Sequence, residues 1–309
     1  MNTKAIRYHQ YGPPEVMVLE TIEAPALTSG QVRVSLCAAG VAPLDTKLRA
    51  GLLERHVPLR LPKIPGRDGA GVIVESSAEG LHVGDAVCVI ADMFGQGTYA
   101  DSIVLPAARV VAQPASLTKR QAAALLQPGA SAWIPMVRTA QVSSGMKILV
   151  HAGSGAVGSL MIRLAVHLGA EVWATCSSAN RDAVLALGAT GVVAHDKEDF
   201  STLRGFDVVF DLVGADTHDR SYPVLKPGGQ LVWLVAAPIR ERGDEFKVRV
   251  IRSIIDDDPE CLRQVALLAQ QQVLVPAVGQ CFPLAEAAFA HALLESGKAP
   301  RGRIVLDIA

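Results

Sequence analysis

The chain has 309 residues, is 50% hydrophobic and carries a formal net charge of −1 at pH 7. That length accommodates about two domains with sizeable cores. The balanced charge gives no bulk attraction to nucleic acid or to an anionic membrane, so we expect neither as a partner.

The cysteines and the lengths of the apolar runs indicate where in the cell the protein is expected. The five cysteines are odd in number, far apart and form no CxxC pair. This usage is typical of a reducing compartment and not of a disulfide framework. The N-terminal segment has no signal-peptide pattern, and the apolar runs are shorter than the roughly 20 residues that span a bilayer. We expect a cytoplasmic protein.

The first 118 residues are rich in short β-branched runs separated by turns that contain glycine and proline. This pattern predicts a compact, partly open barrel, followed by a helix from about Thr118 to Leu126. The predicted strands are Gln31–Leu36, Gly71–Glu75, Ala86–Ile90 and Ser102–Leu105.

From Lys147 onward, apolar runs alternate with helix-length amphipathic segments such as Val157–Leu168 and Arg181–Leu187, each followed by a glycine. Such alternation is typical of a parallel sheet covered by helices on both faces, a doubly wound α/β fold. The predicted strands are Ile148–Ala152, Val172–Thr175, Val192–Ala194, Val208–Val213, Leu231–Ala236 and Val248–Ile255.

After residue 256 the pattern predicts a helix over Pro259–Gln270, a strand, a second helix over Leu284–Glu295 and a final strand over Arg303–Ile308. We expect this tail to return to the first domain. The domains are therefore predicted as 1–118 with 256–309, and 119–255.

A GxGxxG sequence follows the first predicted parallel strand and opens a helix. Isolated GxGxxG sequences are weak signals, but here the strand, loop and helix are in register. In such loops the glycines permit a tight turn, close approach of a pyrophosphate and close helix packing, and the pyrophosphate lies at the helix N-terminus. The residues predicted to bind it are Gly153, Ser154, Gly155, Ala156, Val157 and Gly158.

The end of the second parallel strand decides between NADH and NADPH. An NAD site usually has an acid there for the ribose 2′-hydroxyl, but no acid occurs before Asp182. Ser177, Ser178 and Arg181 could instead bind a 2′-phosphate. The alternatives are helix N-capping for the serines and an exposed helix charge for Arg181. The missing acid favours NADPH as the cofactor.

With these motifs placed, the whole chain resembles the zinc-free, quinone-oxidoreductase-like (zeta-crystallin-like) branch of the medium-chain dehydrogenase/reductase superfamily. The resemblance implies a GroES-like catalytic domain built from both chain ends, with a Rossmann domain inserted between them. It also implies homodimers formed by edge pairing of the last Rossmann strands, around Val248–Ile251. The matching stretches are Ala39–Gly51, Pro65–Val72, Val83–Val87, Gly97–Ala100, Gly153–Gly158, Asp207–Gly214, Leu225–Gly229 and Gly302–Leu306.

The resemblance also predicts that no metal is bound. Zinc-dependent members carry Cys where this chain has Ala42, and Gly-His-Glu where it has Gly66-Arg67-Asp68. A catalytic zinc needs three protein ligands, and neither Ala42 nor Arg67 can supply one. We expect Arg67 and Asp68 to form a local ion pair that steadies their turn.

Further cofactor contacts are implied by matching positions. Ser131 falls where the branch usually has a Thr near the nicotinamide, and His195 where relatives often place a Tyr beside the adenosine ribose. Leu234 and Val235 would form the wall behind the nicotinamide ring. The alternatives are a solvated loop histidine for His195 and plain core packing for Leu234 and Val235.

The resemblance implies hydride delivery to the β-carbon of an enone or enal, or to a quinone. Asp45 and Lys47 are the polar residues expected to line the cleft, against the alternatives of a loop hydrogen bond and a surface charge. The usual Asn near the nicotinamide is replaced by Ala42. Two other functions remain open: an enoyl-thioester (acyl-CoA) reductase, and a non-catalytic NADPH-binding protein.

Overall fold

The computed structural model describes residues 2–235 and 239–308, which fall into two compact units. The first unit combines the chain up to Gln127 with the chain from Asp257 onward, and the second is Pro128–Asp256. The boundaries expected from the sequence lie after residues 118 and 255. The first boundary lies later because α2 (Lys119–Ala122) packs on β3 and β4 of the first unit.

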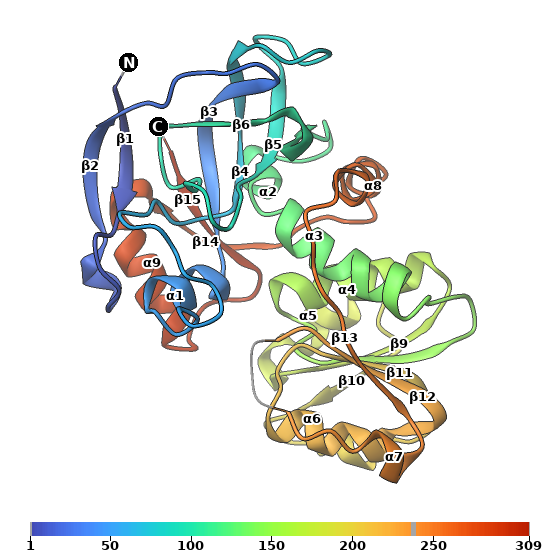
Figure 1. Cartoon of the computed structure of the whole chain (residues 1–309). Helices are drawn as coiled ribbons and strands as arrows, with labels where there is room; N and C mark the ends of the chain where they lie inside the picture. Colours follow the sequence, from blue (N-terminus) through green and yellow to red (C-terminus); the bar gives the residue numbers. More distant parts are fainter. Residues whose placement is uncertain (1, 236–238, 309) are drawn as a thin grey trace. The chain divides into compact units, whose positions relative to one another are not determined.

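The first unit is a β-rich body drawn mainly in blue, cyan and red in Figure 1. In the described chain, one sheet of seven strands has the order β14-β15-β3-β4-β5-β7, with β6 also paired to β3, and β1 and β2 form a separate antiparallel pair. Its strands are β1 (Asn2–Arg7), β2 (Val18–Glu23), β3 (Gln31–Val41), β4 (Asp68–Ser76), β5 (Ala86–Ile90), β6 (Ser102–Pro106), β7 (Val110–Ala112), β14 (Val278–Pro283) and β15 (Arg303–Asp307). Its helices are α1 (Pro43–Arg49), α2, α8 (Pro259–Gln270) and α9 (Ala287–Glu295).

The predicted return of the tail to the first domain is correct. Strand β15 pairs antiparallel with β3, and Ile304 and Leu306 join the core formed by the barrel strands. The last helix begins later than predicted, because Leu284–Glu286 form a 3₁₀ turn before α9. The two chain ends thus share one hydrophobic core.

The second unit contains a parallel sheet of six strands in its described residues, in the order β10-β9-β8-β11-β12-β13. Numbered within the unit, this order is 3-2-1-4-5-6, the doubly wound order that binds dinucleotides where the strand order reverses. Its strands are β8 (Lys147–Val150), β9 (Glu171–Cys176), β10 (Gly191–Ala194), β11 (Phe206–Asp211), β12 (Leu225–Trp233) and β13 (Arg249–Arg252). Its helical segments are α3 (Leu126–Trp133), which starts in the first unit, a π-helical turn (Ile134–Thr139), α4 (Ala156–His167), α5 (Arg181–Leu185), α6 (Asp216–Ser221) and α7 (Gly243–Phe246).

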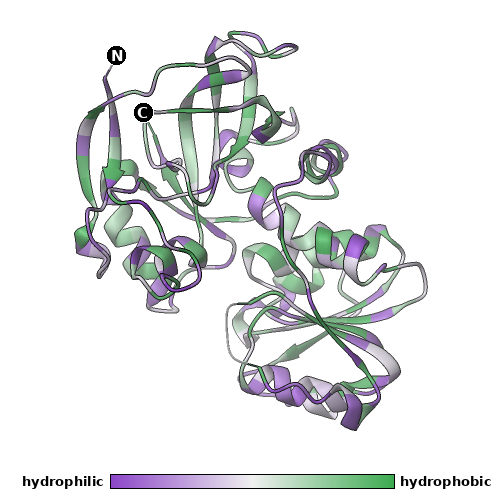
Figure 2. Cartoon of the chain, viewed as in Figure 1, coloured by the Kyte–Doolittle hydropathy of each residue, from purple (hydrophilic) through white to green (hydrophobic). Residues whose placement is uncertain are grey.

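The parallel strands form because their side chains are apolar on both faces. Figure 2 shows the strands of this sheet coloured mostly as hydrophobic, and Ile148, Leu149 and Val150 of β8 are fully buried. The predicted glycine stops also hold: Gly169 and Gly188 have φ of +79° and +101°, a conformation that other residues adopt only with strain. The fold predicted from the sequence is therefore confirmed.

No helix in the described ranges is both long and apolar enough to cross a membrane.

Candidate active site

The phosphate loop connects β8 to α4 at the carboxyl end of the parallel sheet. The amide of Gly153 donates to the carbonyl of Thr175 on β9 at 2.8 Å, and the amide of Gly155 donates to the carbonyl of Ala152 at 3.0 Å. These bonds hold the loop against the end of β9. The first amides of α4 have no partner within the helix and are therefore free to face a bound anion.

The glycines of the loop form a cradle that side chains would fill. A Cβ on Gly158 would lie 2.3 Å from the carbonyl oxygen of Ala152, and a Cβ on Gly153 would lie 2.8 Å from the Cβ of Ala174. Gly155 is less restricted, with 3.2 Å to the carbonyl oxygen of Ala152. The left-handed residue of the turn is Ala152, with φ +52°. Side chains at these glycine positions would therefore force the loop to shift, and binding of a pyrophosphate here stays a prediction.

A buried histidine, His151, lies directly before the phosphate loop and contacts the neighbouring elements. The imidazole of His151 lies 3.1 Å from Thr175 Oγ1 and 2.9 Å from Ser221 Oγ, and its side chain is fully buried. Burial lowers the pKa of His151 to about 4, so the ring is neutral at physiological pH. The neutral ring therefore ties the ends of β8, β9 and α6 together.

The residues predicted for the ribose end gather beside the loop. The Asn180 Nδ2 group donates to Ser177 Oγ at 3.0 Å and to Ser154 Oγ at 3.4 Å. Asn180 thus joins the phosphate loop to the segment after β9. Asn180 is a functional candidate missed at the sequence level, and the available signal is its place between the two serines and Arg181.

Two carboxylates already occupy the polar donors at this end. Ser178 donates its amide and its hydroxyl to Asp196, at 2.7 Å and 2.6 Å. Arg181 donates to both carboxylate oxygens of Glu198, at 3.0 Å and 3.1 Å. The segment after β9 contains no acid before Asp182, as expected from the sequence, because Asp196 and Glu198 both follow β10.

The remaining predicted cofactor residues lie as follows. His195 is exposed and its amide donates to the carbonyl of Cys176 at 3.0 Å, so it adjoins the ribose-end group. Leu234 and Val235 directly follow β12 and are half-buried. Ser131 is half-buried on α3. Their roles toward the nicotinamide and ribose stay predictions.

In the first unit, Asp45 closes the start of α1. Its carboxylate accepts the Ala42 amide at 2.8 Å, lies 3.4 Å from the Tyr99 hydroxyl and is only 3% exposed. The loop hydrogen bond considered as its alternative role is therefore present. Burial raises the pKa of Asp45. Asp45 lines a cavity of about 10 Å³, roughly the space for one water.

Lys47 lies two residues further along α1 and is half-buried.

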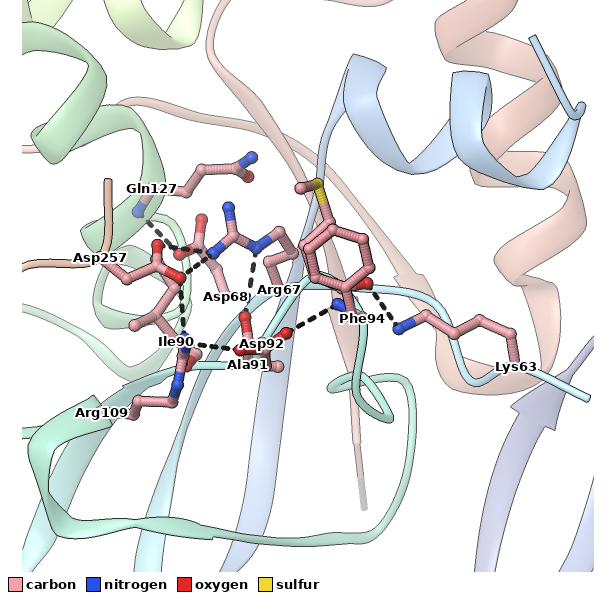
Figure 3. A network of polar contacts seen from close by, with 11 residues as sticks. Lys63, Arg67, Asp68, Ile90, Ala91, Asp92, Phe94, Arg109, Gln127 and Asp257 are labelled. Atoms are coloured by element: carbon pink, nitrogen blue, oxygen red, sulfur yellow. Dashed lines mark hydrogen bonds and ion pairs between the residues drawn. The ribbon is translucent and has the colours of Figure 1, made fainter. Parts of the chain in front are cut away.

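Arg67 is held by a network of polar contacts drawn in Figure 3. Its guanidinium donates to both carboxylate oxygens of Asp257 at 2.6 Å and to the carbonyl of Ala91 at 3.2 Å. Arg109 extends the network, with contacts of 2.8 Å to Asp257 and 2.6 Å to Asp92. The predicted pairing of Arg67 with Asp68 is wrong, since Arg67 bonds to a residue 190 positions away.

Asp68 has a separate set of partners. Its carboxylate accepts the Gln127 amide at 2.8 Å and the Arg303 guanidinium at 2.7 Å. Arg303 also donates to Gln127 Oε1 at 2.9 Å. Burial raises the pKa of Asp68 to about 6, against the opposing effect of Arg303. The chemistry available here is ion pairing, which fixes the surrounding chain.

Two protein-family models match parts of this chain. Residues 28–115 match the model of the alcohol dehydrogenase GroES-like domain, and residues 187–306 match a model described as zinc-binding dehydrogenase. The chain is 31% identical to a 2-haloacrylate reductase from Burkholderia sp, covering 96% of this chain and 97% of that protein. The chain belongs to the quinone oxidoreductase branch of the medium-chain dehydrogenase/reductase superfamily.

Other relatives of this medium-chain reductase agree. It is 31% identical to a chloroplastic NADPH-dependent alkenal/one oxidoreductase of Arabidopsis thaliana, over 98% of this chain and 79% of that one. The structure of the quinone oxidoreductase from Coxiella burnetii matches with a TM-score of 0.88 at 29% identity, covering 100% of both chains. The protein is an oxidoreductase of an NAD(P)-dependent family.

In this reductase, the positions that hold zinc in other members of the superfamily have different contacts. Ala42 is 2% exposed and has no donor atom in its side chain, and Arg67 forms the ion pair described above. Across residues 2–235 and 239–308, no group of three or more His, Cys, Asp or Glu side chains is arranged to hold a metal.

Proposed function

We propose that the protein is an NADPH-dependent reductase of quinones or α,β-unsaturated carbonyl compounds. The glycine cradle of the phosphate loop, at the start of α4 in a doubly wound sheet, is the single observation that carries the proposal, because such a loop lets the backbone approach a pyrophosphate. Relatives named as 2-haloacrylate reductase and alkenal/one oxidoreductase support the acceptor class.

NADPH is the proposed cofactor because Ser177, Ser178 and Arg181, three possible donors to a 2′-phosphate, follow the second parallel strand and no acid precedes Asp182 there. The bound cofactor supplies hydride to an electrophilic carbon. The chain's own contribution is to bind and orient. We propose that the amides at the start of α4 hold the pyrophosphate, that His195 lies beside the ribose, and that Ser131, Leu234 and Val235 border the nicotinamide.

A conjugated acceptor suits this chemistry, since the negative charge that develops spreads onto an oxygen that hydrogen-bond donors can hold. Asp45 would act as a positioning residue, because its buried carboxylate fixes the Ala42 amide and thereby the start of α1. Lys47, on the same short helix, is the candidate for a donor that faces the acceptor. Both assignments are proposals.

The assembly and location are proposed on separate grounds. Strand β13 ends the sheet order among the described strands, so its outer edge can pair with β13 of a second copy, giving a homodimer. A cytoplasmic location fits the five cysteines, none of which forms a disulfide in the described chain.

The acceptor class is tested by following NADPH oxidation with three acceptors: 1,2-naphthoquinone, a medium-chain alkenal and crotonyl-CoA. We expect turnover with the quinone or the alkenal to exceed turnover with crotonyl-CoA by at least about tenfold in kcat/KM. A clear preference for crotonyl-CoA would favour an enoyl-thioester reductase. Tight NADPH binding without turnover on any acceptor would favour a non-catalytic binding protein.

A further inference from the structure

The loops after β9 and β10 meet because the two strands are neighbours in the parallel sheet. Ala194, the last residue of β10, pairs with Cys176, the last residue of β9. The next residues of both strands therefore emerge side by side at the carboxyl edge. This register places Asp196 and Glu198 opposite the segment that contains Ser178 and Arg181.

Asp196 uses both donors of Ser178, at 2.7 Å from its amide and 2.6 Å from its hydroxyl. The hydroxyl bond is the main cause that lowers the pKa of Asp196, so the side chain is an anion at neutral pH. A carboxylate held by an amide and a hydroxyl makes the kind of contact that a phosphate oxygen would make at the same donors.

Glu198 binds Arg181 as Asp196 binds Ser178. Its two oxygens accept from the guanidinium at 3.0 Å and 3.1 Å, and one of them also accepts the Ala194 amide at 2.8 Å. The hydrogen bond from the Ala194 amide fixes the position of the Glu198 side chain. Arg181 therefore directs its charge toward a carboxylate of the same protein.

We propose that Asp196 and Glu198 are specificity-determining residues that compete with the 2′-phosphate of the cofactor for Ser178 and Arg181. The inference rests on the proposed cofactor site. To bind Ser178, a 2′-phosphate must displace Asp196 and then remain close to its negative charge, which is unfavourable. A ribose 2′-hydroxyl can instead donate to Asp196 as it stands. Asp196 and Glu198 thus reduce the ratio of NADPH affinity to NADH affinity below the value that Ser178 and Arg181 alone would give.

The test is the dissociation constant of NADPH and of NADH, measured by titration for the full-length wild type, Asp196→Asn and Glu198→Gln. Removing one competing charge should lower the dissociation constant of NADPH about tenfold. The dissociation constant of NADH should stay within about twofold of the wild-type value in Glu198→Gln, and it should stay so or rise in Asp196→Asn. Titration with 2′-AMP and 5′-AMP isolates the phosphate contact, and only the affinity for 2′-AMP should rise.

The control is Asp182→Asn, which removes an exposed negative charge directly beside Arg181 on α5. If contact with the donors matters, this variant changes the ratio of the two dissociation constants far less than Asp196→Asn does. An equal change in both variants, or an unchanged ratio in Asp196→Asn, overturns the inference while the cofactor site stands. A wild type that binds neither cofactor overturns the proposed function and this inference with it.

Discussion

Arg67 donates two hydrogen bonds of 2.6 Å to Asp257, the residue at which the chain re-enters the first unit. The adjacent residue, Asp68, accepts the amide of Gln127, the last residue before the chain enters the second unit. Two neighbouring residues therefore fix both crossover points of the chain to strand β4 and the turn before it. These are the positions at which zinc-dependent members of the superfamily have His and Glu.

Arg67→Met is expected to destabilise the protein. The ion pair is largely buried, with side-chain exposures of 11% for Arg67 and 21% for Asp257. Removing the cation leaves Asp257 partly buried with Arg109 as its remaining cationic partner, at a cost of about 2–3 kcal/mol. Thermal unfolding checks this, with Arg120→Met at the exposed Arg120–Asp307 pair as the control. Equal melting temperatures for the two variants would contradict it.

Gly158→Ala and Gly155→Ala should separate stability from cofactor binding. The added methyl at position 158 would lie 2.3 Å from a backbone oxygen, so the loop must shift, at a cost of about 1–3 kcal/mol. At position 155 the nearest atom is the carbonyl oxygen of Ala152 at 3.2 Å, which is tight but less so, and stability should therefore fall less than in Gly158→Ala. We expect NADPH affinity to fall in both variants, and the melting temperature to fall mainly in Gly158→Ala. A stable Gly158→Ala that binds NADPH normally would disprove the proposed cradle.

Arg181→Ala should weaken NADPH binding about tenfold or more and leave NADH binding nearly unchanged, because only the 2′-phosphate needs the guanidinium. Arg220→Ala is a suitable control, since Arg220 pairs with Asp199 and Asp216 on the same unit's surface. Binding titrations give the result. If Arg181→Ala weakens NADPH and NADH equally, the assignment of the 2′-phosphate site is incorrect.

Two buried histidines should each lower stability as the pH drops from about 6.5 to about 4, whereas Asp68, with its raised pKa of about 6, acts in the opposite direction. Burial lowers the pKa of His151 to about 4 and that of His291 to about 3. Over that window the unfolded chain binds more protons than the folded one, so each histidine lowers stability by up to about 1.4 kcal/mol per pH unit. Melting temperatures measured across the window should fall less steeply in His291→Gln than in the wild type. Replacement of the exposed His56 by Gln should leave the slope unchanged.

The sequence was most informative where local pattern decides structure. The apolar runs predicted every strand of the parallel sheet, and Pro259–Gln270 matches α8 because it begins with proline after an aspartate cap. The predicted helix from Thr118 to Leu126 is instead divided between α2 and α3. The antiparallel pair β1–β2 was not predicted, because β2 is mostly exposed and both strands carry charged residues.

Long-range partners were beyond local pattern. The contact of Arg67 with Asp257 depends on where the chain returns after the whole second unit, which no local spacing specifies. Asp196 is different, because the 3-2-1 strand order places the end of β10 beside the end of β9. The contact of Asp196 with Ser178 could therefore have been expected from the strand order.

The central claim is that a reduced nicotinamide dinucleotide bound at the phosphate loop delivers its hydride to the β-carbon of a conjugated acceptor. The most direct measurement uses NADPH deuterated at C4 of the nicotinamide with an alkenal, followed by NMR of the product. Deuterium bonded to the former β-carbon is the result predicted. Deuterium at the carbonyl carbon, giving an allylic alcohol, would contradict the account.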